Sequence, residues 1–257
     1  MSDTSLFGTR HLVLVAISIA LIVGLFFLVK KITIKQASKI LLLVGIVSEI
    51  VKVFYYIQAN EEKYGGVLPK SDLPFHLCSI QIILILIVNL TNNEKIKRLI
   101  FSFMVPSCLF GGIAAILIAT SSARSTIIIA LQYFLYHVAI TVFALRLLTD
   151  KEMNWNIKDL FNCFKVLLVM MFFAIYINSI VYDGVSNINF MYVVGPPQEG
   201  LPFLNKNHGW LVYIAHYACL IVICVSLCYI KAIIKAVKER KQAPAIAQEQ
   251  EAEKVTK

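Results

Sequence analysis

Charge is scarce in this sequence. Asp, Glu, Lys and Arg make up 15% of its 257 residues, whereas soluble domains carry about 25%. Apolar residues take their place: 59% of the chain is hydrophobic, and the mean hydropathy is +0.77. This balance excludes an ordinary soluble domain. We expect an integral membrane protein of the all-α class.

The motifs of soluble enzymes are also missing. The sequence contains no G-x-S-x-G, no H-E-x-x-H, no glycine loop for phosphate and no dinucleotide fingerprint. Its six cysteines all lie in apolar runs, which argues against a disulfide framework, and none has the paired spacing of a zinc site. The basic residues do not cluster with aromatic residues on a polar surface, so nucleic-acid binding is not expected. We expect no metal and no cofactor.

Apolar runs of roughly the length that crosses a bilayer as helix occur seven times. They are His11–Lys30, Lys39–Ala59, Asp72–Leu90, Lys97–Thr120, Thr126–Leu148, Lys158–Val181 and Gly209–Ile230. The first run is too long for a signal peptide and ends in two lysines instead of a cleavage site. The sequence therefore predicts a polytopic bundle of seven transmembrane helices.

The basic residues predict how the bundle is oriented, because loops rich in Lys and Arg stay cytoplasmic. The connections between the first and second, the third and fourth, and the fifth and sixth runs, together with the segment from Lys231 to Lys241, hold fifteen basic residues. The opposite set holds five, namely Arg10, Lys63, Lys70, Arg124 and Lys206. We expect an outer N-terminus, a cytoplasmic C-terminus and a multi-pass protein of the cell membrane. Residues 1–241 form the expected membrane domain, and the polar tail 242–257 is expected to be disordered.

Ionisable residues inside a membrane span are costly and often mark a site. Glu49 and Lys52 lie three residues apart in the second run, so they can pair on one helix face. One interpretation is a neutralised structural pair. The other is the wall of a binding site, in which Lys52 holds an anionic group.

A second group of polar residues lies in the outer half or the middle of the predicted bundle. Its members are His76, Cys78 and Gln81 of the third run, His137 of the fifth and His216 of the seventh. Each residue taken alone is well explained as a packing or hydrogen-bonding residue. Their shared depth on three helices favours a site.

Helical geometry limits the chemistry of this group. We expect the third helix to start at Ser71 or Asp72 with Pro74 in its first turn, which places His76 and Cys78 about 200° apart on its surface. A nucleophilic Cys78 would then take its base from another helix, either His137 or His216. His76 or Gln81 would stabilise an oxyanion.

Two further segments are unusual. The outer connection from Val181 to Gly209 is long, and its NFMYVVGPP stretch is too apolar to lie in water, so we interpret it as a lid over the bundle or as a packed connector. In the fourth run, PSCLFGG combines Pro106 with small residues. Gly111 and Gly112 predict close packing against a neighbouring helix.

At this point the residues resemble a known family. Leu73-Pro74-Phe75-His76-Leu77-Cys78, the histidine of the fifth run and Asn189-Phe190-Met191-Tyr192 before a proline resemble the YwaF-type membrane proteins of bacteria. These are similar to the eukaryotic transmembrane protein 164 group. The resemblance implies seven helices, a phospholipid acyltransferase activity that uses Cys78, and substrate contacts at Asn189 and Tyr192. The chain departs from the family pattern at Gly195, where we expect a basic residue.

Two functions remain open. In the first, the protein is an intramembrane enzyme that transfers or hydrolyses an acyl chain, with Cys78 as nucleophile. In the second, the same residues bind a small or lipid-like ligand, and the protein is a transporter or a sensor. Membrane lipids are the expected partners in both.

Overall fold

In the computed structural model of the chain, residues 5–59, 66–120, 123, 126–198, 201, 204–240 and 242 are described. Helices occupy all seven expected ranges, and the described residues contain no strand. The helices are α1 Thr9–Val29, α2 Ile34–Ala59, α4 Leu77–Leu90, α5 Glu94–Leu117, α6 Ile127–Thr149, α7 Ile157–Val181 and α8 Trp210–Cys228. The all-α prediction is confirmed. Residues 243–257 of the expected disordered tail lie outside the described residues.

Six of the helices are long and apolar enough to cross a membrane, by length and composition. The exception is α4, which has 14 residues. At about 1.5 Å per residue it rises about 21 Å, less than the about 30 Å of a hydrocarbon core.

The expected start of α4 is wrong. Residues 70–72 form a short 3-10 helix, Leu73 is extended (φ −58°, ψ 149°), and α4 begins after His76, its N-cap residue. Pro74 explains the difference, because a residue that precedes proline is driven out of the helical region. His76 is therefore not a helical residue, and the expected angle of 200° between His76 and Cys78 does not apply.

Polar side chains begin three of the other helices. Asn93 accepts hydrogen bonds from the first-turn N–H groups of α5, and Thr126 does so for α6. Asn156 and Asp159 form a capping box at the start of α7. These caps satisfy N–H groups that a helix leaves without partners.

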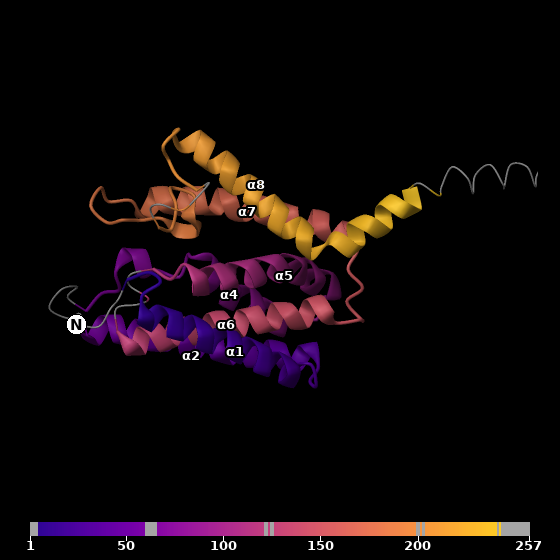
Figure 1. Cartoon of the computed structure of the whole chain (residues 1–257), viewed down its shortest axis with the longest axis horizontal. Helices are drawn as coiled ribbons and strands as arrows, with labels where there is room; N and C mark the ends of the chain where they lie inside the picture. The colour runs from indigo at the N-terminus through magenta and orange to yellow at the C-terminus, as the bar shows by residue number, and fades with distance from the viewer. Residues whose placement is uncertain are drawn as a thin grey trace, which may run out of the picture.

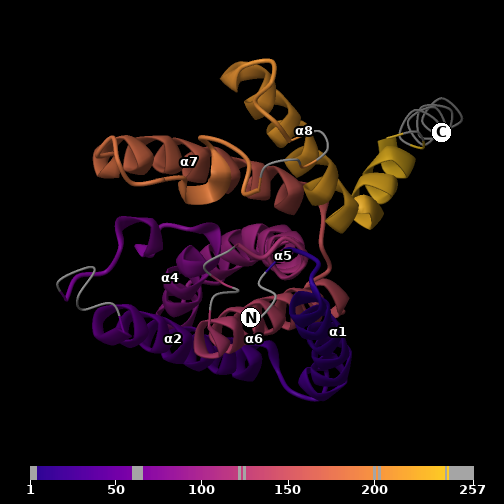
Figure 2. The same cartoon turned by 60° about the vertical axis from the view of Figure 1, so that its left-hand side comes forward.

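The helices form two groups (Figures 1 and 2). α1, α2, α4, α5 and α6 pack together, while α7 and α8 lie on the other side of α5. In α5 and α6, 67% and 61% of the apolar window is buried inside the protein, against 11% in α1 and α8 and 17% in α2 and α7. The outer helices therefore present most of their apolar surface to the surroundings, as expected in a bilayer.

Specific contacts hold the two groups together. Arg98 of α5 donates from two nitrogens to the buried carboxylate of Asp159 on α7, at 2.7 Å each. From the segment after α8, the Tyr229 hydroxyl donates to the carbonyl of Ser102 at 2.7 Å. Both contacts involve α5, which is the common support of the two groups.

Close packing at Gly112 confirms one expectation from the PSCLFGG motif. A Cβ atom at Gly112 would lie 2.2 Å from Oγ1 of Thr141 and 3.1 Å from the carbonyl oxygen of His137. The α5 and α6 backbones approach each other this closely because position 112 has no side chain.

Candidate functional site

Cys78 is a half-buried residue in the first turn of α4. No side chain caps this helix, so its first N–H groups are not taken up by a capping residue. The N–H groups of Cys78 and Ser79 interact with the Cys78 sulfur. The start of α4 thus combines a thiol with backbone donors that can stabilise negative charge beside it.

Groups from three other helices surround this turn. The Tyr136 hydroxyl of α6 donates to the carbonyl oxygen of Cys78 at 2.7 Å. Cys108 of α5 and the Glu49–Lys52 pair of α2 lie within electrostatic range of Cys78. Cys78 therefore sits where α2, α4, α5 and α6 meet.

The predicted pairing of Glu49 with Lys52 is confirmed, with 2.7 Å between Nζ and Oε1. The Lys52 ammonium also donates to the carbonyl oxygen of Asp72 at 3.0 Å. These contacts use two of its three N–H bonds. The pair fixes the chain that leads into α4 and leaves one donor for a further group.

The outer connection folds onto this region. Its residues 189–194, here called the strap, include the short 3-10 helix Phe190–Tyr192, in which Phe190 is fully buried. The ring of His76 lies 5.1 Å from that of Phe190 and 6.0 Å from that of Tyr192, between centroids. Burial raises the pKa of Tyr192, so its hydroxyl stays protonated. The strap therefore packs against the residue that starts α4.

Hydrogen bonds hold the strap in an uncommon conformation. Met191 and Tyr192 both have positive φ, 55° and 56°, a backbone region that non-glycine residues rarely occupy. Their carbonyl oxygens accept hydrogen bonds from the hydroxyls of Tyr217 and Tyr213 of α8. Asn178 of α7 bonds both the N–H and the carbonyl of the residue before them. Four side-chain bonds thus keep the strap against α7 and α8.

Asn189, expected to contact substrate, supports the strap itself. Its side chain donates to the carbonyl of Gly195 at 2.9 Å and accepts from the N–H of Val194 at 3.1 Å. Gly195 is the position where the family resemblance implies a basic residue. The Lys206 chain lies against it, with Nζ 3.7 Å from the place of a Cβ atom at 195. A lysine from later in the same connection therefore brings positive charge to this position.

Asp183 joins the outer connection to the segment before α4. It accepts hydrogen bonds from the N–H and hydroxyl of Ser186, both at 2.7 Å, and from the N–H of Val185 at 3.0 Å. It also pairs with Lys70 at 2.9 Å. The bonds from Ser186, and then the Lys70 ammonium, hold the pKa of Asp183 well below its usual range.

The three predicted histidines differ in their surroundings. His76 donates its Nε2 proton to the carbonyl of Ser71 at 3.1 Å, and His137 donates its Nδ1 proton to the carbonyl of Tyr133 at 2.7 Å. Each of these two rings therefore has its other nitrogen in the basic form. His216 is exposed on α8. Within the described ranges, no hydrogen bond joins Cys78 to a histidine.

His76 and His137 are each connected to the region of Cys78 through a tyrosine. The His137 ring is 5.8 Å from that of Tyr136, whose hydroxyl binds the Cys78 carbonyl. The His76 ring touches that of Tyr192, which lies within electrostatic range of the Cys78 sulfur. Each histidine thus contacts a tyrosine that lies near Cys78.

Gln81 is 1% exposed and lies one helical turn after Cys78. Its Nε2 donates to the Ser107 hydroxyl of α5 at 3.1 Å. Its Oε1 is buried and has no hydrogen-bond partner among the described residues. Gln81 therefore offers a free acceptor, whereas an oxyanion would need a donor, for which its amide has one further N–H.

Several supporting residues escaped the sequence analysis. These are the tyrosines of α6 and α8, Asn178, Ser107 and a buried histidine, His11, whose Nε2 donates to the carbonyl of Ile116 at 3.1 Å. Tyr213 and Tyr217 are one turn apart on a helix, which was the one visible signal. The others are ordinary residues until the fold supplies their partners.

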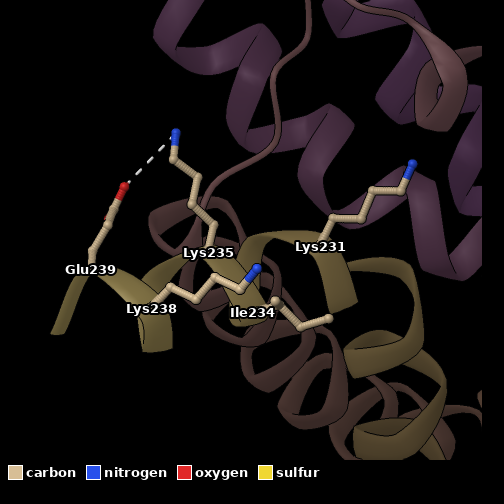
Figure 3. Close-up of a pocket in the computed structure, with 5 residues that line it drawn as sticks. All are labelled: Lys231, Ile234, Lys235, Lys238 and Glu239. Carbon is tan, nitrogen blue, oxygen red and sulfur yellow. Dashed lines mark ion pairs between the residues drawn. The ribbon is translucent and has the colours of Figure 1, made fainter. Parts of the chain in front are cut away.

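Two cavities lie outside this cluster. One of about 370 Å³ lies beside the strap, and its lining includes Asn178, Val193 and Trp210. The other, of about 380 Å³, is formed by Lys231, Ile234, Lys235, Lys238 and Glu239 after α8 (Figure 3). That segment lies at the end of the molecule away from the segment before α4 (Figure 1). The second cavity is therefore not part of the Cys78 site.

Comparison with known proteins gives one match. The family model described as the TMEM164 family matches residues 6–229. No curated protein and no solved structure matches the chain. The matched range includes every residue of the cluster around Cys78.

Proposed function

Because the chain belongs to the TMEM164 family, a family of membrane proteins, we propose that it is an intramembrane acyltransferase with Cys78 as its nucleophile. The observation that carries this proposal is the start of α4, where a half-buried thiol lies close to two backbone N–H groups and within electrostatic range of the Lys52 ammonium. Thiols in such positions are suited to covalent catalysis.

The first step is the attack of the Cys78 thiolate on the ester carbonyl of a donor lipid. A carbon–sulfur bond forms, and negative charge develops on the carbonyl oxygen, within reach of the N–H groups of Cys78 and Ser79. When the carbon–oxygen bond breaks, the lysolipid leaves as an alcohol after it takes up the proton removed from the thiol. The acyl chain remains on Cys78 as a thioester.

The second step returns the enzyme to its starting state. The hydroxyl of an acceptor lipid attacks the thioester, its proton passes to the base, and the carbon–sulfur bond breaks. The thiolate then takes the proton back. No oxidant or further reactant is required. If water takes the place of the acceptor, the same site hydrolyses the ester.

A base is needed because burial among apolar side chains disfavours a free thiolate. His76 and His137 are suited to this role, since each has one ring nitrogen bound to a carbonyl and the other in the basic form. The exposed position of His216 on α8 makes it the weaker candidate.

The third N–H bond of Lys52 suits the phosphate of a lipid headgroup. Glu49 and the Asp72 carbonyl hold the ammonium at the level of the first turn of α4. A phosphate there would leave the ester of the same lipid near the thiol. We place this site in the outer half of a cell membrane, on the distribution of basic residues.

The test uses purified protein with mixed phospholipids and looks by mass spectrometry for an acyl adduct on Cys78 and for remodelled lipids. Cys78→Ala should abolish both, and Cys78→Ser should remain badly impaired, because a buried hydroxyl is harder to ionise than a thiol. Cys219→Ala, at an exposed cysteine of α8, is the matched control and should remain active.

A different result would favour a binding protein. If no adduct forms over a broad lipid panel and Cys78→Ala is silent, while changes at Lys52 alter ligand affinity, the site binds a ligand without chemistry. The acyltransferase proposal would then be abandoned.

A further inference from the structure

We propose that Oε1 of Gln81 accepts the hydrogen bond of the hydroxyl group that attacks the acylated Cys78. This inference rests on the proposed function, and it names the chemical class of the second substrate: a hydroxyl-bearing acceptor, either a lysolipid or water. Gln81 then orients the attacking oxygen, while Cys78 holds the acyl group.

The orientation of the Gln81 amide is determined by its neighbours. The Ser107 hydroxyl donates its one proton to the carbonyl of Phe103 at 2.7 Å. Ser107 can therefore only accept from Gln81, so the amide nitrogen must point toward it and Oε1 must point elsewhere. The free atom is for this reason the acceptor and not the donor.

An acceptor without a partner is costly in this position. A buried polar atom that lacks a hydrogen bond destabilises the folded protein, and Gln81 is 1% exposed. Asn89, the other amide of α4, has no such atom: its oxygen accepts from Ser38, and its nitrogen donates to carbonyls of Ser38 and Ile85. The absence of a donor is therefore specific to Gln81 and not a general feature of α4.

The position of Gln81 relates it to the thiol. Residues 78 and 81 are neighbours on one helix face, about 5–6 Å apart between Cβ atoms. Their neighbours on α5 are also consecutive: Ser107 bonds Gln81, and Cys108 lies within electrostatic range of Cys78. A hydroxyl bound to Oε1 would thus approach the thioester from the α5 side of the same turn.

The experiment separates formation of the thioester from its transfer. Purified full-length protein receives phosphatidylcholine with an isotopically labelled acyl chain. The adduct on Cys78 is followed by intact mass with and without added lysophosphatidylcholine. The added lysophosphatidylcholine carries an acyl chain of a different length, so labelled phosphatidylcholine of the new mass reports transfer to a lysolipid, and labelled fatty acid reports transfer to water.

Gln81→Met keeps the length of the side chain and removes the acceptor. We expect the adduct to form within about twofold of the wild-type rate and to decay about 10–100 times more slowly, which corresponds to about 1.4–2.7 kcal/mol in the transition state and is typical of one lost hydrogen bond. Ser107→Ala frees the amide to turn and should slow the decay less. Gln132→Met is the matched control, because it removes a similar bond, from Gln132 of α6 to Ser48 of α2 at 2.6 Å, that involves no residue of α4.

The outcomes are distinct. Decay at the wild-type rate in Gln81→Met, or equal slowing in Gln132→Met, overturns the role of Gln81 and leaves the proposed function intact. A wild-type protein that forms no adduct overturns the proposed function, and this inference with it. If Gln81→Met does not fold, the decay rate in Ser107→Ala decides: an unchanged rate counts against the inference.

Discussion

Replacement of Gly112 by alanine tests the packing that holds α5 against α6 beside the site. The new Cβ atom would lie 2.2 Å from Oγ1 of Thr141, more than an ångström inside ordinary contact, which begins at 3.4 Å. Thr141 could rotate away only by losing its 2.7 Å hydrogen bond to the carbonyl of His137. The Cβ atom would still lie 3.1 Å from that backbone oxygen, so the helices themselves must separate.

The size of the effect follows from these contacts. Overpacking of this kind costs about 1–3 kcal/mol, which lowers the melting temperature by about 2–4 °C per kcal/mol in a chain of this length. The neighbouring Gly111 is the matched control. A Cβ atom there meets only Leu77, at 3.6 Å, so Gly111→Ala should keep or raise the melting temperature, since alanine favours helix by about 1 kcal/mol over glycine.

The assay follows thermal exposure of buried thiols with a maleimide dye in detergent. Cys108 and Cys163 are fully buried, and their labelling reports loss of the bundle. A melting temperature for Gly112→Ala equal to or above that of Gly111→Ala would refute the reasoning. Such a result would mean that α5 and α6 do not approach each other at position 112.

Two further predictions concern the outer connection and the orientation. Since the pKa of Asp183 is lowered in the folded protein, its contribution to stability is present above the ordinary aspartate pKa of about 3.9 and is lost only as pH falls through the lower folded value. Hydrogen-exchange protection of the Val185 amide should therefore persist from pH 7 to about pH 4. Loss of this protection already near pH 5, or equal protection in Asp183→Asn, would contradict the prediction. In a protein without native cysteines, a cysteine introduced at Lys238 should resist a membrane-impermeant thiol reagent in intact cells, and a cysteine introduced at Ser5 should react with it. The reverse labelling pattern would invert the proposed orientation.

The pattern of apolar residues in the sequence was sufficient to predict the helices. Long apolar runs specify helix in a membrane because the backbone must satisfy its own hydrogen bonds there, and helices occur in all seven expected ranges. The pairing of Glu49 with Lys52 was also predictable, since both residues lie on one helix and their spacing determines the contact. Local patterns could not locate the start of α4, because Pro74 was compatible with a first helical turn as well as with the extended segment that forms.

Contacts between helices were decided by the tertiary structure alone. Nothing in the sequence indicates that Tyr136 binds the Cys78 carbonyl or that the strap packs on His76, because these residues come from segments far apart in the chain. The same holds for Gln81, whose polarity suggested a donor for an oxyanion. Only the Ser107 hydroxyl of α5 commits its amide nitrogen and leaves the oxygen free. The sequence alone thus determined which segments form apolar helices, where hydrophobicity and local spacing suffice, and the fold determined which polar atoms meet between them, since that depends on how the helices pack.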